Sequence, residues 1–216
     1  LPPSKWAVAM DTWSIPKALR STWDASYMLR QGALLGFRHP GTWAKTWEPM
    51  LKSMKNPAYA VQTMDQLATR PLANVGHEAG VMFDEIWQGN EFFGSSQLPK
   101  KIPGVGGSER GFVIAGNKIR NESFDAVVRD WLPKGYDLRA NPINSLAEAA
   151  AITGKSEQDF RDIALLYNAA SGRSNVKWLQ GNLGRVLNIA FWAPGWGTSI
   201  PEVAVRTVGS AGARKE

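Results

Sequence analysis

Apolar side chains recur at helical intervals over one long stretch near the middle of the chain, residues 108–132. Ser108 can cap the start of a helix there, Glu109 places negative charge in its first turn, and Pro133 stops it. The pattern therefore predicts a central packing helix over residues 108–132. The apolar or small positions form two stripes, first Phe112, Ala115, Gly116, Ile119 and Ser123, then Phe124, Val127, Val128 and Trp131.

Two glycines inside this predicted helix need a reason, because each weakens a helix by roughly 1 kcal/mol relative to alanine. Gly111 and Gly116 would thin one face of the helix, so we expect a second helix to approach it closely. The cations of the stretch fall mostly between the apolar stripes; they are Arg110, Lys118, Arg120 and Arg129.

Shorter helices are predicted on both sides of the central one, from capping residues and apolar spacing. In the stripe of TWAKTWEPMLKSMK, Pro49 should bend the helix or end its first half. Asn56-Pro57 should start the next helix, and Ser145 and Ser156 should cap two later ones. The predicted spans are about 16–23, 25–37, 42–55, 57–69, 146–153, 157–171 and 178–191, with stops at Gly154 and Gly172.

Residues 72–107 carry many glycines and prolines, and we expect a long surface loop there. A short helix at 91–95 is the exception. A loop of this length is unusual inside a compact domain, which favours contact with a partner.

The whole pattern predicts an all-α fold, an irregular multi-helix assembly, because no alternating strand run or hairpin signal occurs. We expect one helical domain over residues 1–207 and a flexible tail over residues 208–216. The chain begins at Leu1 without methionine, which favours a fragment of a much longer polypeptide.

Composition adds a basic charge and many tryptophans. The formal charge is +6, and ten tryptophans are scattered along the chain, which suits helix packing or broad protein contact. There is no cysteine, and no run approaches the ~18 apolar residues of a membrane span. Cations gather around the start of the central helix, and they are the candidate contacts for DNA or an acidic partner: Lys100, Lys101, Arg110, Lys118 and Arg120.

No residue pattern indicates catalysis, a cofactor or a metal. The segment GVGGSERG at 104–111 is glycine-rich before a helix, but no strand precedes it and no Lys-Ser/Thr pair follows, so we interpret it as a hinge. His39 and His77 lie in different segments, and His39 before Pro40 is interpreted as a turn residue. The carboxylate pairs are interpreted as solvated faces; they are Asp84/Glu85, Glu157/Asp159 and Asp159/Asp162.

Four phrases, in this order, resemble a helical segment near the C-terminal part of very large bacteriophage polyvalent proteins. They are SIPKALRSTWDASYMLRQGALLGFRHP, KKIPGVGGSERGFVIAGNKIRNESFD, LLYNAASGR and VLNIAFWAPGW, and the resemblance covers residues from about Ser14 to Pro194. Members of that family are internal virion or ejection proteins, some with enzymatic domains elsewhere in the polypeptide. The chain departs from the pattern where Gly111 follows Ser-Glu-Arg and over residues 75–94.

The resemblance implies a structural role in a phage particle, in the portal or tail lumen or in a channel that carries DNA through the cell envelope. The implied partners are portal, tail tube or other ejection proteins, a symmetric homo-oligomer, and phage DNA contacted without sequence preference. The alternative is a DNA-binding or effector module delivered into the host, which predicts salt-dependent DNA affinity of the isolated chain. An enzyme ranks third, because no active site is evident.

Overall fold

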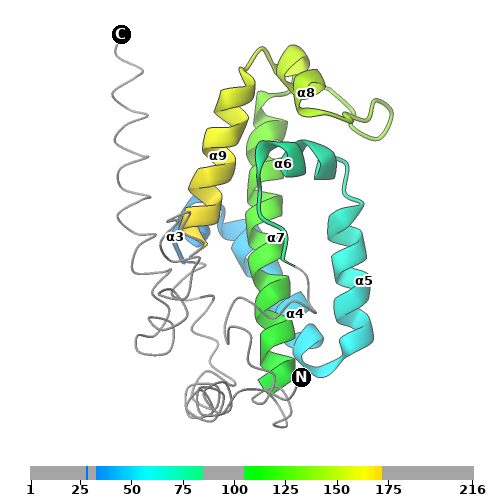
Figure 1. Ribbon diagram of the computed structural model, residues 1–216, viewed down its shortest axis with the longest axis vertical. Coiled ribbons are helices and arrows are strands. Elements are labelled where there is room, and N and C mark those ends of the chain that lie inside the picture. Colours follow the sequence, from blue (N-terminus) through cyan, green and yellow to red (C-terminus); the bar gives the residue numbers. More distant parts are fainter. Residues whose placement is uncertain (1–27, 29–32, 85–104, 172–216) are drawn as a thin grey trace, which may run out of the picture.

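The computed structural model describes residues 28, 33–84 and 105–171, and these form helices joined by short non-helical segments, as the sequence predicts. The longest helix, α7 (Val105–Trp131), runs through the middle of the molecule, with α5 (Pro57–Ala68) and α9 (Glu157–Ala170) on opposite sides of it (Figure 1). The most extensive partner of α7 is α4 (Pro40–Lys55), which crosses behind it in this view. The fold is thus organised around the predicted central helix.

The start of α7 differs from the prediction. The helix begins at Val105, so the buried Ser108 lies within its first turn and not at the capping position before it. Its apolar stripes are buried as expected, and Phe112, Ile119 and Phe124 have at most 1% of their surface exposed. Helical structure therefore extends into the segment that was interpreted as a hinge.

Glycine allows α4 and α7 to pack with their backbones close together. A Cβ atom at Gly111 would lie 2.5 Å from Met54 Cγ and 2.9 Å from the Met50 carbonyl oxygen. One turn earlier, a Cβ at Gly107 would lie 2.6 Å from the Met54 carbonyl oxygen. The expected close approach of a second helix is confirmed at Gly111, and Gly116 is buried as well.

Pro49 neither ends nor splits α4, which continues from Pro40 to Lys55. The missing N–H of Pro49 removes one hydrogen bond, to the carbonyl of Lys45. Packing offsets that loss, because Met50 is fully buried and Trp43 and Trp47, both against the core, meet edge to face at 5.5 Å. Tertiary contact outweighs the local cost of the proline here.

The predicted helix caps at Asn56, Ser145 and Ser156 are confirmed. The Asn56 side chain accepts from the backbone N–H groups of Ala58 and Tyr59 at the start of α5. Ser145 caps α8 (Leu146–Thr153), which ends at Gly154 in the left-handed region with φ 67°. Ser156 and Asp159 form a full capping box on α9.

The segment 72–107 is not one continuous loop. Residues Ala73–Ala79 form helix α6, which ends at Gly80 with φ 89°, and residues 81–84 follow without helical structure. The buried, helical Met28 falls within the predicted helix at 25–37, and helix α3 (Ala33–Arg38) overlaps the end of that span and extends one residue beyond it. The helices predicted at 16–23, 91–95 and 178–191, the stop at Gly172 and the tail at 208–216 lie outside the described residues.

Candidate functional site

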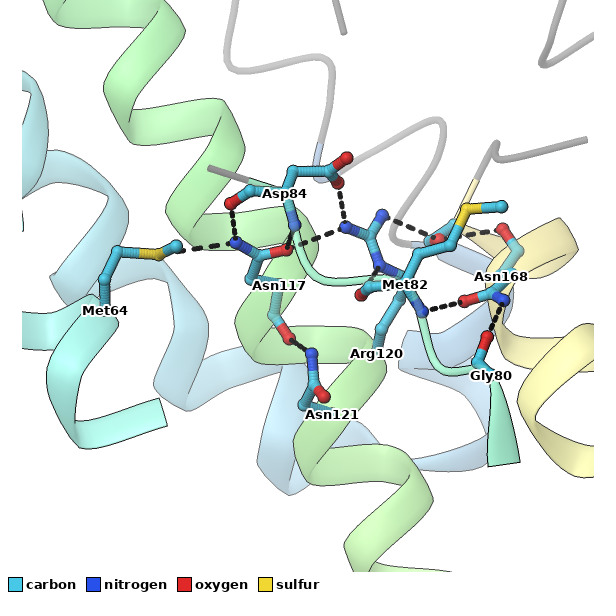
Figure 2. Close-up of polar contacts among 9 residues, drawn as sticks. Met64, Gly80, Met82, Asp84, Asn117, Arg120, Asn121 and Asn168 are labelled. Atoms are coloured by element: carbon cyan, nitrogen blue, oxygen red, sulfur yellow. Dashed lines mark hydrogen bonds and ion pairs between the residues drawn. The ribbon is translucent and has the colours of Figure 1, made fainter. Parts of the chain in front are cut away.

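A buried polar network occupies the face of α7 that meets α9 and the segment 80–84 (Figure 2). Asn117, Arg120 and Asn121 supply its centre, and their spacing of three and four residues places them on one face of the helix. Asn117 is fully buried, and Asn121 is 2% exposed. Buried polar groups of this kind must be hydrogen-bonded, so their partners define what the site does.

Two side-chain amides hold the backbone of the segment after α6. Asn117 accepts from the Asp84 backbone N–H at 2.8 Å and donates to the Asp84 carbonyl at 2.7 Å. Asn168, on α9, accepts from the Met82 N–H at 2.9 Å and donates to the Gly80 carbonyl at 2.8 Å. The amides thus replace the hydrogen bonds that a neighbouring strand would supply, and they fix this segment between α7 and α9.

The Arg120 guanidinium also contacts this segment and completes the network. It forms an ion pair with the Asp84 carboxylate and donates to the Met82 carbonyl at 3.3 Å and to Ser171 Oγ at 3.2 Å. Its side chain is entirely buried, whereas that of Asp84 is 22% exposed. Arg120 therefore links the segment 80–84 with the end of α9.

Burial removes Arg120 from the candidate DNA contacts. An arginine taken out of water needs a charged partner and hydrogen bonds for its remaining donors, and Arg120 has both. A basic surface that includes Arg120 is therefore not present, because its side chain faces the interior of the fold. Sequence spacing did not reveal it, because Asp84, the partner carboxylate, lies 36 residues away along the chain.

Arg110 is also committed inside the fold. Its guanidinium donates to the carbonyl oxygens of Ser53 at 3.4 Å and of Met54 at 3.2 Å. These carbonyls belong to the last turn of α4, which lacks helical partners and carries the negative end of the helix dipole. Arg110 therefore completes the C-terminus of α4.

Of the three remaining candidate contacts, only Lys118 lies within the described residues. Lys118 is mostly buried and pairs with Glu122 one turn along α7, while Lys100 and Lys101 lie outside the described residues. The described residues contain as many lysines and arginines as aspartates and glutamates, so the whole excess of +6 belongs to the other segments of the chain. Of the three candidate cations that are described, Arg110, Lys118 and Arg120, each is engaged by groups of the fold, and they do not form one basic surface.

A second buried ion pair joins the turn after α5 to α7. The Nε of Arg70 donates to both carboxylate oxygens of Asp125, at 3.2 and 3.1 Å, and its Nη1 donates to the Leu67 carbonyl at 2.8 Å. Burial raises the pKa of Asp125 above its ordinary value, and the Arg70 charge opposes that rise. Desolvation of the carboxylate is thus only partly offset by its partner.

The other sequence candidates serve structural contacts. The glycines of 104–111 that are described lie in α7, where Gly107 and Gly111 face α4. His39 lies between α3 and α4, as a turn residue should, and its Nε2 is 2.7 Å from the Tyr167 hydroxyl. Within the described part of the chain, no three His, Asp or Glu side chains are grouped closely enough to hold a metal ion.

The carboxylates of α9 are exposed and make local contacts. Glu157 pairs with Arg161, Asp162 accepts from Gln158, and Asp159 closes the capping box. Of the carboxylate pair Asp84/Glu85, Asp84 forms an ion pair with Arg120, and Glu85 is outside the described residues. These contacts give the carboxylates roles in helix stability.

Sequence reasoning missed Asn117 and Asn168, the two amides at the heart of the network. One signal was present: Asn117, Arg120 and Asn121 fall on a single helical face between apolar positions. A polar face half-way along a central helix is compatible with a buried network and with a solvated surface, so the pattern alone does not distinguish them.

No protein-family profile, curated protein or solved structure matches this chain. In the part of the chain that the structure describes, no helix is long and apolar enough to cross a bilayer.

Proposed function

We propose that this chain is a structural component of a bacteriophage particle, an internal or ejection protein segment lodged in the portal or tail lumen or contributing to a channel for DNA. The buried network on α7 is the observation that supports a structural role. Its side chains connect α5, the segment 80–84, α7 and α9, with Asn117 also donating to Met64 Sδ at 3.3 Å. The arginine and asparagine side chains of this network hold the helices in fixed positions.

The phage context rests on the four phrases quoted above, which extend over most of the chain. Portal, tail tube or other ejection proteins would be its neighbours, and copies of the chain would assemble with rotational symmetry. The exposed apolar side chains of α3, α4 and α5 fit such contacts; they are Phe37, Leu51 and Val61, with 87%, 48% and 41% exposed.

Mass spectrometry of purified particles tests this proposal. We expect peptides of the chain in intact virions at a copy number that matches the symmetry of the portal or tail. A map of the particle should place α7 and its neighbours against other virion proteins. Absence of the chain from intact particles would refute the virion role.

The second candidate is a DNA-binding or effector module, favoured by the charge of +6. Because the described helices are charge-balanced, this candidate needs the cations of the other segments, including Lys100 and Lys101. It predicts tight binding of the isolated chain to random-sequence duplex DNA, falling steeply as salt is raised. The structural proposal predicts weak binding at low salt only.

A double substitution separates the two candidates. Under the DNA-binding hypothesis, Lys100→Gln with Lys101→Gln should lower both the affinity and the salt slope measured by fluorescence anisotropy. The matched control is Lys134→Gln with Lys155→Gln, which removes the same charge from two exposed positions. Equal losses in both variants would indicate a general charge effect without a DNA site.

A further inference from the structure

Phe37 is the most exposed large apolar side chain among the described residues. It lies in the last turn of α3 with 87% of its surface exposed. A phenylalanine that is covered by a partner buries about 150–250 Å² of surface, and aromatic side chains are enriched at protein interfaces. Phe37 is therefore available as the anchor of a contact with another molecule.

A small open cavity of the same chain has the size of a phenyl ring. Its volume is about 200 Å³, and a cavity of about 150 Å³ is enough to hold benzene. Its walls are largely apolar, with Ala73 on α6 and Val81 and Phe83 in the segment after that helix. The exposed Asn74 and His77 also line it, so the cavity opens to solvent. An apolar side chain of a partner can enter it.

The exposed ring and the cavity also match in chemistry. Inside the cavity, Phe83 offers an aromatic ring that an inserted phenyl group can meet edge to face. Opposite charges adjoin the two features. Arg38 is exposed directly after Phe37, and Glu78 is exposed on α6 directly after the cavity residue His77. A phenylalanine followed by an arginine is thus complementary to this cavity.

Phe37 and the cavity lie on different sides of one molecule. In Figure 1, α3 lies beside the end of α9, whereas α5 lies across α7 from it, and Ala68 at the end of α5 lines the cavity. The ring of one copy therefore reaches the cavity of another copy and not its own. A contact between two different patches is head-to-tail, and such contacts close into a ring of copies when the rotation between neighbours permits it.

We propose that Phe37 of one copy inserts into the cavity between α6 and α7 of a second copy, and that this contact joins copies of the chain head to tail. The contact rests on the proposed function, because the symmetric assembly needs one contact that is repeated between copies. A single phenyl ring covers far less than the about 1,200–2,000 Å² of a stable interface. Two free copies therefore associate weakly, and closure of a ring strengthens the assembly because each copy then makes two contacts.

Cross-linking of single-cysteine variants at high protein concentration tests the contact, since the chain has no cysteine of its own. Gly41→Cys places a thiol four residues after Phe37, at an exposed position where a Cβ meets nothing within 4 Å. Asn74→Cys places a thiol at the exposed edge of the cavity. With a bismaleimide linker, we expect the mixture of these two variants to give at least about tenfold more dimer than Lys155→Cys mixed with Asn74→Cys.

The position of the thiols also distinguishes a head-to-tail contact from a symmetric one. Gly41→Cys alone and Asn74→Cys alone should each give only the background of the Lys155→Cys control, because the same patch does not meet itself. Equal yields from the mixed pair and from the control would refute the contact. A high yield from either variant alone would refute the head-to-tail arrangement.

Phe37→Ala tests the anchor. It removes a side chain that is exposed in the free chain, so the fold is preserved, and in the Gly41→Cys chain it should lower the cross-linking to background. Leu51→Ala removes another exposed apolar side chain, on α4, and should leave the yield unchanged. Unchanged cross-linking in Phe37→Ala would overturn the assignment.

Ala73→Leu tests the cavity by filling it, and in the Asn74→Cys chain it should lower the cross-linking in the same way. Ala147→Leu, at an exposed position of α8, is its control. Should Ala73→Leu unfold, the result of Phe37→Ala still decides. Presence of the chain in intact virions without this cross-link would refute the contact alone, whereas a specific cross-link by a chain that is absent from virions would refute the virion role alone.

Discussion

Two faces of the same helix, α7, are held in opposite ways. Near its start, Gly107 and Gly111 bring its backbone against Met50 and Met54 of α4, and the contact depends on the absence of side chains. Half-way along, Asn117 and Arg120 contact the segment 80–84, and that contact depends on what the side chains donate and accept.

The difference follows from the backbone hydrogen bonding of the two elements that contact α7, helix α4 and the segment 80–84. Helix α4 has its own backbone hydrogen bonds, so close packing is enough, and only the last carbonyls need Arg110. In the segment 80–84, the Gly80 and Val81 N–H groups bond to the last turn of α6, whereas the Met82 and Asp84 N–H groups take their partners from α9 and α7. One helix therefore needs small residues on one face and polar residues on another.

The largest effect is expected at the polar face. Arg120→Ala should lower the free energy of unfolding by about 3–5 kcal/mol, because it removes the buried cation that pairs with the Asp84 carboxylate and donates to the Met82 carbonyl. Chemical denaturation measures this loss. Arg129→Ala, at an exposed position of the same helix, should change stability by less than about 0.5 kcal/mol. Similar losses in both variants would show that the buried network contributes little.

The next effect is expected at the glycine face. Gly111→Ala should cost about 2–3 kcal/mol, because its Cβ meets both Met54 and the Met50 carbonyl. Gly41→Ala is the control in α4, where a Cβ meets nothing within 4 Å. That change should stabilise the chain by up to about 1 kcal/mol in the same denaturation experiment, since alanine favours a helix. Stabilisation by both would contradict the close packing of α4 on α7.

A smaller effect should follow the removal of one amide. Asn168→Ala leaves the Met82 N–H and the Gly80 carbonyl unpaired and should cost about 1–2 kcal/mol. Hydrogen exchange should show faster exchange of the Met82 amide, while amides in the middle of α5 keep their protection. Unchanged exchange at Met82 would mean that Asn168 does not hold this segment.

The smallest effect concerns pH. Burial lowers the pKa of His39, with the Arg38 charge acting in the same direction and Asp130 opposing it. The neutral ring therefore contributes stability that is present above its ordinary pKa of 6.5 and is lost as the pH falls through the lowered value.

Replacing His39 should flatten this dependence. For His39→Gln, the free energy of unfolding should change less between about pH 7 and pH 5 than it does for the unaltered chain. His77→Gln alters an exposed side chain on α6 and serves as the control. A pH profile that is the same with and without His39 would contradict the proposed linkage.

The sequence by itself determined the all-α class and most helix ends. The caps at Asn56, Ser145 and Ser156 act within a few residues of the chain, and so the spacing of capping residues predicts them. The buried stripes of α7 and the thin face at Gly111 follow from the same local periodicity.

Only the tertiary structure decided which polar residues lie inside. Whether Arg120 faces solvent or the core depends on Asp84, Met82 and Ser171, which reach it from distant parts of the chain. Residues 73–79 became a helix inside a predicted loop, and α4 continues through Pro49. In each case long-range packing and hydrogen bonding outweighed local propensity, and local propensity is the signal that a sequence pattern records.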